Sequence, residues 1–281
     1  MREAEVRVLA AEPAASRLER WSFNGVLAVL AGSALLLLVA PTLVVLVTSF
    51  TSAFSLKFPP PGYSLRWYEA LLFDSPEIVE AAWVSFKVAG SATIASVLLG
   101  TSAALGLARR RETWARLVDS LFMSPLMLPT LALGLALLVL FNLAGTGLSV
   151  ATLVAGHVAI TSPYVLRTTT AALQQLDPAL AESAMSLGAS PRRVLFTITL
   201  PLVAPGIAAG AFIGFMASFD NVAISLLLSD ARSEVLPIRL WHIIEASLDV
   251  RAAAASGLLI AATVVLGVIM ERLAGISRHL R

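Results

Sequence analysis

The sequence predicts an all-α integral membrane protein with six transmembrane helices, and three observations support this fold class. Hydrophobic residues make up 58% of the 281-residue chain, charged residues only 14%, and the mean hydropathy is +0.85. Soluble domains are roughly 45–50% apolar and about 25% charged, so this composition indicates a lipid environment. The apolar residues also form segments of about 20 residues, the length that an α-helix needs to cross a bilayer. Alternating segments of about ten residues, which a β-barrel requires, are not found.

Six segments reach this length, and each is expected to form one span. The first follows a basic tail, residues 1–23. The second is uncharged from residue 89 onward and rich in small residues, which let helices approach closely in lipid, so we expect it to pack inside the bundle. The six segments are residues 24–52, 82–108, 117–142, 148–171, 201–229 and 252–274.

The first segment could instead be a cleaved signal peptide, because Arg residues precede it. Its uncharged apolar run covers Val26–Val47, whereas the apolar run of a signal peptide has about 7–15 residues. We therefore expect an uncleaved first helix and a transmembrane domain over residues 24–281.

Arg and Lys are unevenly divided between the predicted loops. Of the 20 such residues, 14 lie in the two chain ends and the loops of one side and 5 in the loops of the other, while Lys87 lies at the start of a span. Cytoplasmic loops carry an excess of these residues, so both termini are predicted to be cytoplasmic.

A net charge of +2 is too small to indicate nucleic-acid binding, and the absence of Cys excludes disulfides.

Residues 177–201, between the fourth and fifth spans, differ from every other loop. Asp177 and Ser190 can each cap a short helix that has proline at its first position, and Gly188 between them suits a left-handed stop. Leu200-Pro201 is then expected to turn the chain back toward the membrane. The pattern predicts two amphipathic helices on the cytoplasmic face, and a connector lying on lipid would show it too. The expected apolar face of the first helix consists of Leu180, Ala184 and Leu187.

The same loop resembles the EAA motif of ABC importer permeases, which runs E-A-A, three residues, G, nine residues, I, one residue, L-P. Ser183, in place of the first Ala, is the one departure. The resemblance extends from about Phe50 to Leu273, and residues 218–222 and 236–238 are similar to spermidine/putrescine-type permeases. That branch often has an acidic residue where this chain has Asn221. The matching residues of the motif are Glu182, Ser183, Ala184, Gly188, Ile198, Leu200 and Pro201.

The resemblance implies the transmembrane-domain fold of a type I importer in a bacterial inner membrane. In such importers two permeases pair, two ATPase subunits dock below and an external binding protein delivers the solute, and residues 177–201 would form the coupling loop. Arg192 and Arg193 are interpreted as positive-inside anchors. Neither Lys57 nor Lys87 has the preceding Gly of a P-loop. We therefore expect a non-catalytic chain without a cofactor, with ATP and Mg on the partner ATPase.

Asp220 is the clearest charge inside a predicted span. A carboxylate at a helix centre costs about 2.5–3.5 kcal/mol on insertion scales, so it usually faces the bundle interior or a cavity. We predict that Asp220 lies on the solute path and attracts a cation, with Asn221 and Ser225 on the same face. Alternatively, it pairs with a basic group such as Arg239 or one of the partner permease, or it caps a break in the helix. His157 is interpreted as a packing residue.

Two other functional classes fit the sequence less well. A secondary transporter would usually show internal repeats with interrupted helices in both halves, and none are evident. An intramembrane enzyme needs a nucleophile and a base, and neither H-E-x-x-H nor G-x-S-x-G occurs. The predicted solute is a small organic cation of the polyamine type, with a phosphonate as the alternative. The sequence leaves open whether the chain pairs with itself or with a related chain.

Overall fold

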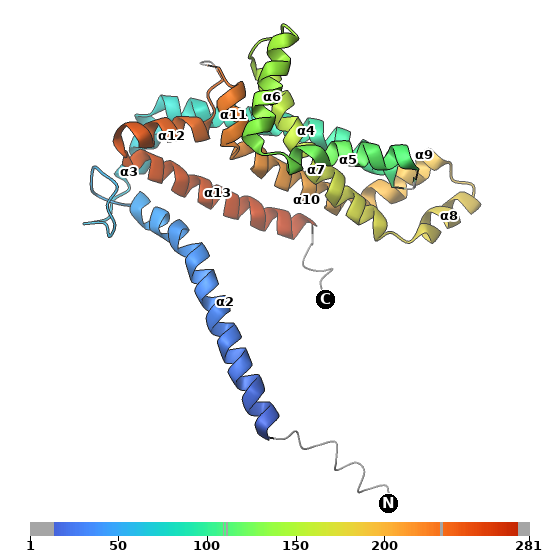
Figure 1. The fold of residues 1–281 in the computed structure, drawn as a ribbon, viewed down its shortest axis with the longest axis horizontal. Helices are drawn as coiled ribbons and strands as arrows, with labels where there is room; N and C mark the ends of the chain where they lie inside the picture. Colours follow the sequence, from blue (N-terminus) through green and yellow to red (C-terminus); the bar gives the residue numbers. More distant parts are fainter. Residues whose placement is uncertain (1–13, 109, 111, 231–232, 275–281) are drawn as a thin grey trace, which may run out of the picture.

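The computed structural model describes residues 14–108, 110, 112–230 and 233–274, and this part of the chain is all-α (Figure 1). One isolated bridge joins Thr51 and Tyr63. Of the predicted tail, residues 1–13 lie outside the described part, and from Ala14 the chain is already helical. The long helices are α2 (Ala14–Ser49), α4 (Pro76–Leu107), α7 (Val150–Gln174), α10 (Leu200–Phe219) and α13 (Val250–Ala274).

The centre of the bundle is made by α4, α7 and α10, which pack against one another. Small residues allow this close packing: a Cβ added at Gly210 would lie 2.7 Å from the Cα atom of Val165. The prediction of an interior helix after residue 89 is confirmed, because the face of α4 turned to its neighbours is buried. Its buried residues in this stretch are Ala89, Ala92, Ser96, Gly100 and Ala104.

The structure does not confirm the count of six spans. The helical stretches long and apolar enough to cross a membrane are Phe23–Ser49, Pro76–Leu107, Pro191–Phe219 and Val250–Arg272, which makes four in the described part of the chain, or five with the bent third segment. The predicted fourth span corresponds to α7, which has sufficient length at 25 residues. Its buried His, Ser and Thr residues make α7 more polar than the other long helices.

The third predicted span is divided into α5 (Thr113–Met127) and α6 (Thr130–Leu143), which are bent by 110°. The reason is Pro129, which lacks an N–H group and disfavours helical backbone at the residue before it. Leu128 is accordingly extended, with a ψ of 144°. Figure 1 shows α6 standing out of the bundle, at a steep angle to α5.

The fifth predicted span begins earlier and ends earlier than expected. The chain is continuously helical from α9 (Pro191–Val194) through the π-helix η1 (Leu195–Thr199) into α10, so the predicted turn at Leu200-Pro201 is wrong. The N–H group of Leu200 donates to the carbonyl of Leu195, which gives the wider π turn just before Pro201. A π turn can accommodate the proline ring, which a regular α-helix would bring against the carbonyl of residue i−4. After α10 a break at Asp220 and Asn221 precedes α11 (Val222–Leu228).

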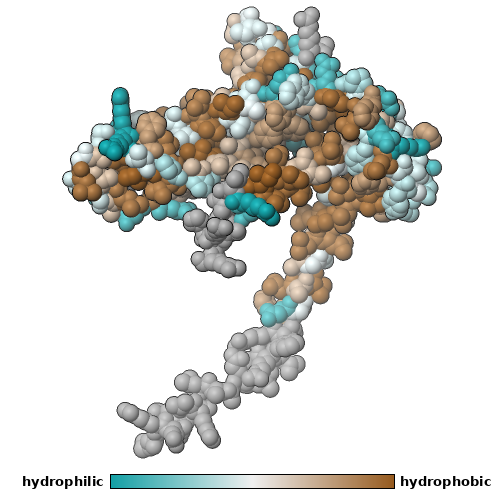
Figure 2. Space-filling view, turned by 180° about the vertical axis from the view of Figure 1, so that it is seen from behind, coloured by the Kyte–Doolittle hydropathy of each residue, from teal (hydrophilic) through white to brown (hydrophobic). Residues whose placement is uncertain are grey.

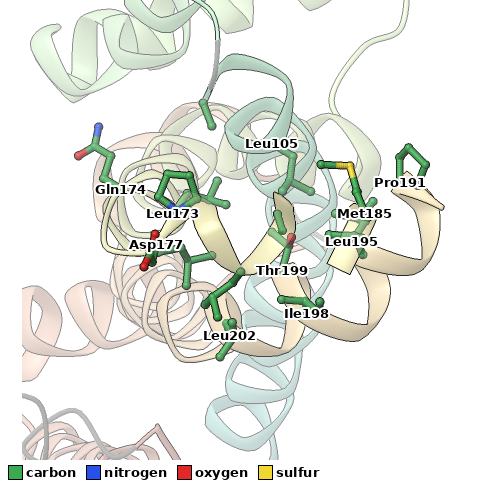
Figure 3. A pocket seen from close by; sticks show the side chains of 16 residues that line it. Leu105, Leu173, Gln174, Asp177, Met185, Pro191, Leu195, Ile198, Thr199 and Leu202 are labelled. Carbon is green, nitrogen blue, oxygen red and sulfur yellow. The ribbon is translucent and has the colours of Figure 1, made fainter. Parts of the chain in front are cut away.

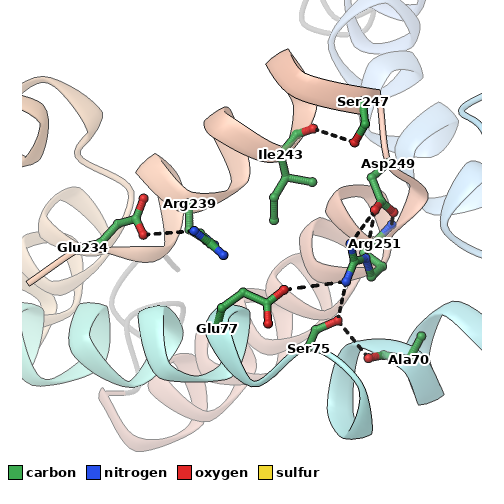
Figure 4. Close-up of polar contacts among 9 residues, drawn as sticks. All are labelled: Ala70, Ser75, Glu77, Glu234, Arg239, Ile243, Ser247, Asp249 and Arg251. Atoms are coloured by element: carbon green, nitrogen blue, oxygen red, sulfur yellow. Dashed lines mark hydrogen bonds and ion pairs between the residues drawn. The ribbon is translucent and has the colours of Figure 1, made fainter. Parts of the chain in front are cut away.

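The two ends of the bundle carry different short helices (Figure 1). At one end lie α8 (Pro178–Ser186) and α9, and at the opposite end lie α3 (Arg66–Phe73) and α12 (Leu236–Ser247). Ionic contacts fix the second end, where the Arg251 guanidinium lies 2.8 Å from Asp249 and 3.6 Å from Glu77 (Figure 4). Burial raises the pKa of Asp249, but the hydrogen bonds and charge of Arg251 outweigh this and leave the pKa below its ordinary value.

Candidate functional site

The coupling loop predicted at residues 177–201 begins with the expected capped helix. The Asp177 carboxylate accepts a hydrogen bond from the Ala179 N–H at 2.9 Å, and Pro178 occupies the first turn of α8. At the other end, Gly188 has a φ of +88°, the left-handed value that its position requires. The N–H groups of Gly188 and Ala189 donate to the carbonyls of Met185 and Ala184, which is the Schellman arrangement. The predicted caps and stop of this helix are therefore confirmed.

The face of α8 that meets the bundle differs from the predicted one. Ala181 is buried, with 9% of its surface exposed, whereas Leu187 is 89% exposed. Below α8 lies a hollow of about 680 Å³, between the ends of α4 and α7 and the helix that starts at Pro191 (Figure 3). Leu180 and Met185 line this hollow. Leu187, which is expected on the same helix face as Leu180 and Ala184, follows the last residue of α8, and its side chain is directed to the surface.

The residues of the EAA-like motif fall on three elements and on the Gly188 turn. Glu182 and Ser183 are exposed on α8, and Ala184 is half-buried. Ile198 belongs to η1 and lines the hollow, while Leu200 and Pro201 open α10. Arg192 and Arg193 are exposed in the first turn of α9. The exposed part of this motif is thus a small surface of α8 at one end of the bundle, and its contact with an ATPase stays a prediction.

Asp220 lies at the other end of the same continuous helix. From Pro191 to Phe219 there are 29 residues, which at 1.5 Å per residue is roughly 43 Å. The side chain of Asp220 is exposed, and no hydrogen bond or ion pair engages it among the residues with described positions. Arg239, the suggested partner, pairs instead with Glu234 at 3.5 Å (Figure 4).

One alternative for Asp220 was that it caps the break in the helix, but its neighbour Asn221 provides the cap. The amide oxygen of Asn221 accepts from the Ile224 N–H at 2.8 Å and so caps α11. Within the described residues, the carboxylate of Asp220 therefore neither pairs with a basic group nor caps the break. Its placement on a solute path stays a prediction.

Ser225, the third residue predicted on this path, is buried and lies beside His157. The His157 Nε2 atom is 3.2 Å from the Ser225 hydroxyl, and Nδ1 is 2.7 Å from the hydroxyl of Ser218. All three side chains are at most 3% exposed, so His157 is a hydrogen-bonded packing residue, as predicted. Its two partners could not be found from the sequence, because they lie 61 and 68 residues away.

Comparison with known proteins identifies the family. The model of the binding-protein-dependent transport system inner membrane component matches residues 96–278, more than half of the chain. Two Escherichia coli (strain K12) proteins each match 83% of this chain. The spermidine/putrescine transport system permease protein PotC is 28% identical over 88% of its own length, and the putrescine transport system permease protein PotI is 31% identical over 84% of its length. The molybdenum transport system permease protein ModB of Mycobacterium bovis is 32% identical over 70% of this chain and 81% of its own.

Solved structures share the fold. A chain of a bacterial ABC transporter involved in the import of the acidic polysaccharide alginate has a TM-score of 0.68 and 17% identity, covering 95% of this chain and 99% of that one. A bacterial alginate ABC transporter in complex with an alginate pentasaccharide-bound periplasmic protein gives a TM-score of 0.67 at 16% identity, covering 94% and 97%. The predicted all-α transmembrane fold is thereby confirmed. The chain belongs to the family of binding-protein-dependent transport system inner membrane components, the permease subunits of ABC transporters.

Proposed function

We propose that this permease imports a small organic cation of the polyamine type, driven by ATP hydrolysis on a separate subunit. Relatives alone do not decide the solute, because the family includes both polyamine and molybdenum permeases. The observation that favours a cation is the exposed carboxylate of Asp220, which has no partner within the described chain. A carboxylate at that position can exchange part of its hydration for an ammonium group.

The two ends of one helix suggest how ATP hydrolysis would drive transport. The helix that starts at Pro191 follows α8 after the Gly188 turn and ends beside Asp220. A displacement of α8 by a docked ATPase would therefore reach the opposite end of the bundle through a continuous rigid element. Such an element can couple closure of the ATPase to a change in which side of the membrane the bundle opens to.

The surface of α2 supports a second permease subunit as partner. In the most apolar 18-residue window of the helix Phe23–Ser49 no residue is buried, although Thr48 and Ser49 at its end are. Figure 2 shows hydrophobic side chains covering α2 where it leaves the bundle. Lipid covers part of such a surface, and the neighbouring permease of the pair would cover the rest. An external solute-binding protein would then dock at the end formed by α3 and α12, with both termini of the chain cytoplasmic.

Interrupted spans are also a feature of secondary transporters. Here both the third and the fifth segment are interrupted, at Leu128-Pro129 and at Asp220-Asn221. Breaks alone therefore do not separate the two classes of transporter, whereas family membership favours the ABC importer.

Uptake of radiolabelled putrescine into cells that express the full transport system tests the proposed solute. We expect accumulation that depends on this chain and that excess unlabelled spermidine inhibits, while methylphosphonate has no effect. No putrescine uptake, together with chain-dependent uptake of a phosphonate, would refute the cationic solute.

A further inference from the structure

The break between α10 and α11 is bridged from a third helix by one buried side chain. His157 of α7 contacts Ser218 in the last turn of α10 at 2.7 Å and Ser225 of α11 at 3.2 Å. The imidazole ring is 1% exposed. We call these three residues the His157 bridge.

The hydrogen-bonding groups of the His157 bridge can hold the ends of α10 and α11 in one geometry. A neutral imidazole has one N–H donor and one acceptor nitrogen, and each serine hydroxyl can supply the complementary group. Both ring nitrogens are therefore satisfied only when the ends of α10 and α11 lie on either side of the ring. Breaking one contact would leave a buried polar group without a partner, which is unfavourable in an apolar interior.

The backbone does little to fix the angle at this break. The N–H groups of Asp220 and Asn221 donate to carbonyls within α10, those of Met216 and Ser218, and the amide of Asn221 caps α11. These contacts end one helix and begin the next, but none joins the body of α11 to α10. The Ser225–His157–Ser218 contacts do join them, through α7.

We propose that His157 is a positioning residue that sets the angle between α10 and α11, and with it the place of Asp220 and Asn221 at the break. The geometric part of this inference stands on the contacts alone. Its consequence for transport rests on the proposed function, in which Asp220 meets the solute. The bridge would then pass a movement of α10 relative to α7 on to α11, in addition to the apolar packing of Ile224 and Leu228.

Distances between two spin labels across the break test the geometric part. The chain has no Cys, so labels can be attached to cysteines introduced at Ile213 of α10 and Leu226 of α11, whose side chains are exposed. Measurements use the purified full assembly. Ser225→Ala removes the contact to α11 alone, and His157→Phe removes both contacts while keeping a ring. We expect both variants to broaden or shift the distance distribution relative to the labelled parent.

A matched control is Ser49→Ala, which removes a buried serine hydroxyl that contacts the Tyr68 hydroxyl at 2.7 Å, at the junction of α2 and α3. This variant should leave the distance distribution unchanged. If His157→Phe does not assemble, the distance distribution of Ser225→Ala alone tests the proposal. An unchanged distribution in Ser225→Ala would overturn the proposal, as would an equal broadening in Ser49→Ala.

Uptake kinetics test the consequence for transport, with radiolabelled putrescine as the probe. His157→Phe should raise the KM for uptake, and adding Asp220→Asn should raise it little further, because the carboxylate has already lost its place. A purely structural role would lower the amount of assembled protein and leave KM unchanged. Should the parent protein not transport putrescine, the proposed solute fails, while the distance measurement still decides the role of His157.

Discussion

Single residues fix the two ends of α8, the start of α9 and the break after α10. The caps at Asp177 and Ser190 and the left-handed Gly188 follow from residues within a few positions, and the structure has all three. In the His157 bridge, Ser218 and Ser225 lie 61 and 68 positions after His157 in the sequence, so no local pattern reveals these contacts. That no described residue pairs with Asp220 likewise depends on where distant parts of the chain lie.

Replacing Asp220 by Asn tests its assignment to the solute path. The substitution keeps the size of the side chain and removes its charge. If the charge attracts a cationic solute, the apparent affinity for uptake should fall by about tenfold or more, which corresponds to about 1.4 kcal/mol. The measurement is the concentration dependence of putrescine uptake.

Asp74→Asn is the control for this experiment, because Asp74 is also an exposed carboxylate but lies at the end of α3. Its removal should change the affinity little. Unchanged affinity in Asp220→Asn would take the residue off the path, and a loss of assembly would show that Asp220 pairs with a partner chain.

Gly210 tests the close packing of α7 on α10. In Gly210→Ala the new Cβ would lie 2.7 Å from the Cα of Val165, a backbone atom that cannot move without shifting α7. Overpacking of this kind costs about 1–3 kcal/mol. We expect a lower temperature of thermal unfolding in detergent, whereas Gly106→Ala in α4, with nothing within 4 Å, should not lower it. Equal unfolding temperatures for the two variants would contradict the packing described here.

At the scale of elements, hydropathy indicated which segments are apolar but not where a helix bends or continues. Pro129 breaks the third segment, while Pro201 lies in a continuous helix after the π turn η1. Pro163 of α7 and Pro205 of α10 also lie inside continuous helices, so the same residue type has opposite outcomes and does not by itself predict a break. Leu187, which was expected on the apolar face of α8, lies after the last residue of that helix and is exposed, because the chain turns at Gly188.

The Gly188 turn gives a prediction about coupling. A Cβ at this position would meet no atom within 4 Å, so its requirement for glycine comes from the φ of +88° and not from space. Holding a β-branched residue there costs about 1–3 kcal/mol, whereas Asn tolerates the left-handed conformation. Gly188→Val should therefore abolish solute-stimulated ATP hydrolysis by the assembly, and Gly188→Asn should retain much of it.

Both variants should be present in the membrane at the level of the parent protein, since the turn is exposed. Full ATP hydrolysis and uptake with Val at position 188 would mean that α8 is only a surface connector. Glu182→Lys, an exposed change of charge on the same helix, should reduce coupling without altering the turn.

At the scale of the whole molecule, the all-α membrane architecture was predictable because composition and span length determine it. Assembly with other subunits was less predictable, because the sequence could not show that α2 leaves the bundle with its apolar surface uncovered. The orientation of the chain still rests on the uneven division of Arg and Lys. It predicts α8 on the cytoplasmic side, and the loop before α3 outside.

Labelling of single cysteines checks this orientation in right-side-out membrane vesicles. Ser55→Cys, in the loop before α3, should react with a membrane-impermeant maleimide added outside. Ser186→Cys on α8 should react only after the vesicles are opened. Both side chains are exposed in the structure, so a lack of reaction reports sidedness. Reaction of Ser186→Cys in sealed vesicles would reverse the proposed topology.

Putrescine uptake by proteoliposomes tests whether this chain forms the membrane part of an importer driven by ATP hydrolysis on other subunits. The proteoliposomes contain the assembly purified through a tag on this chain, and the external solute-binding protein is added. We expect uptake only when ATP is present on the side of α8, and none with the Gly188→Val assembly. Uptake without ATP, driven by an ion gradient alone, would contradict this expectation and identify the chain as a secondary transporter.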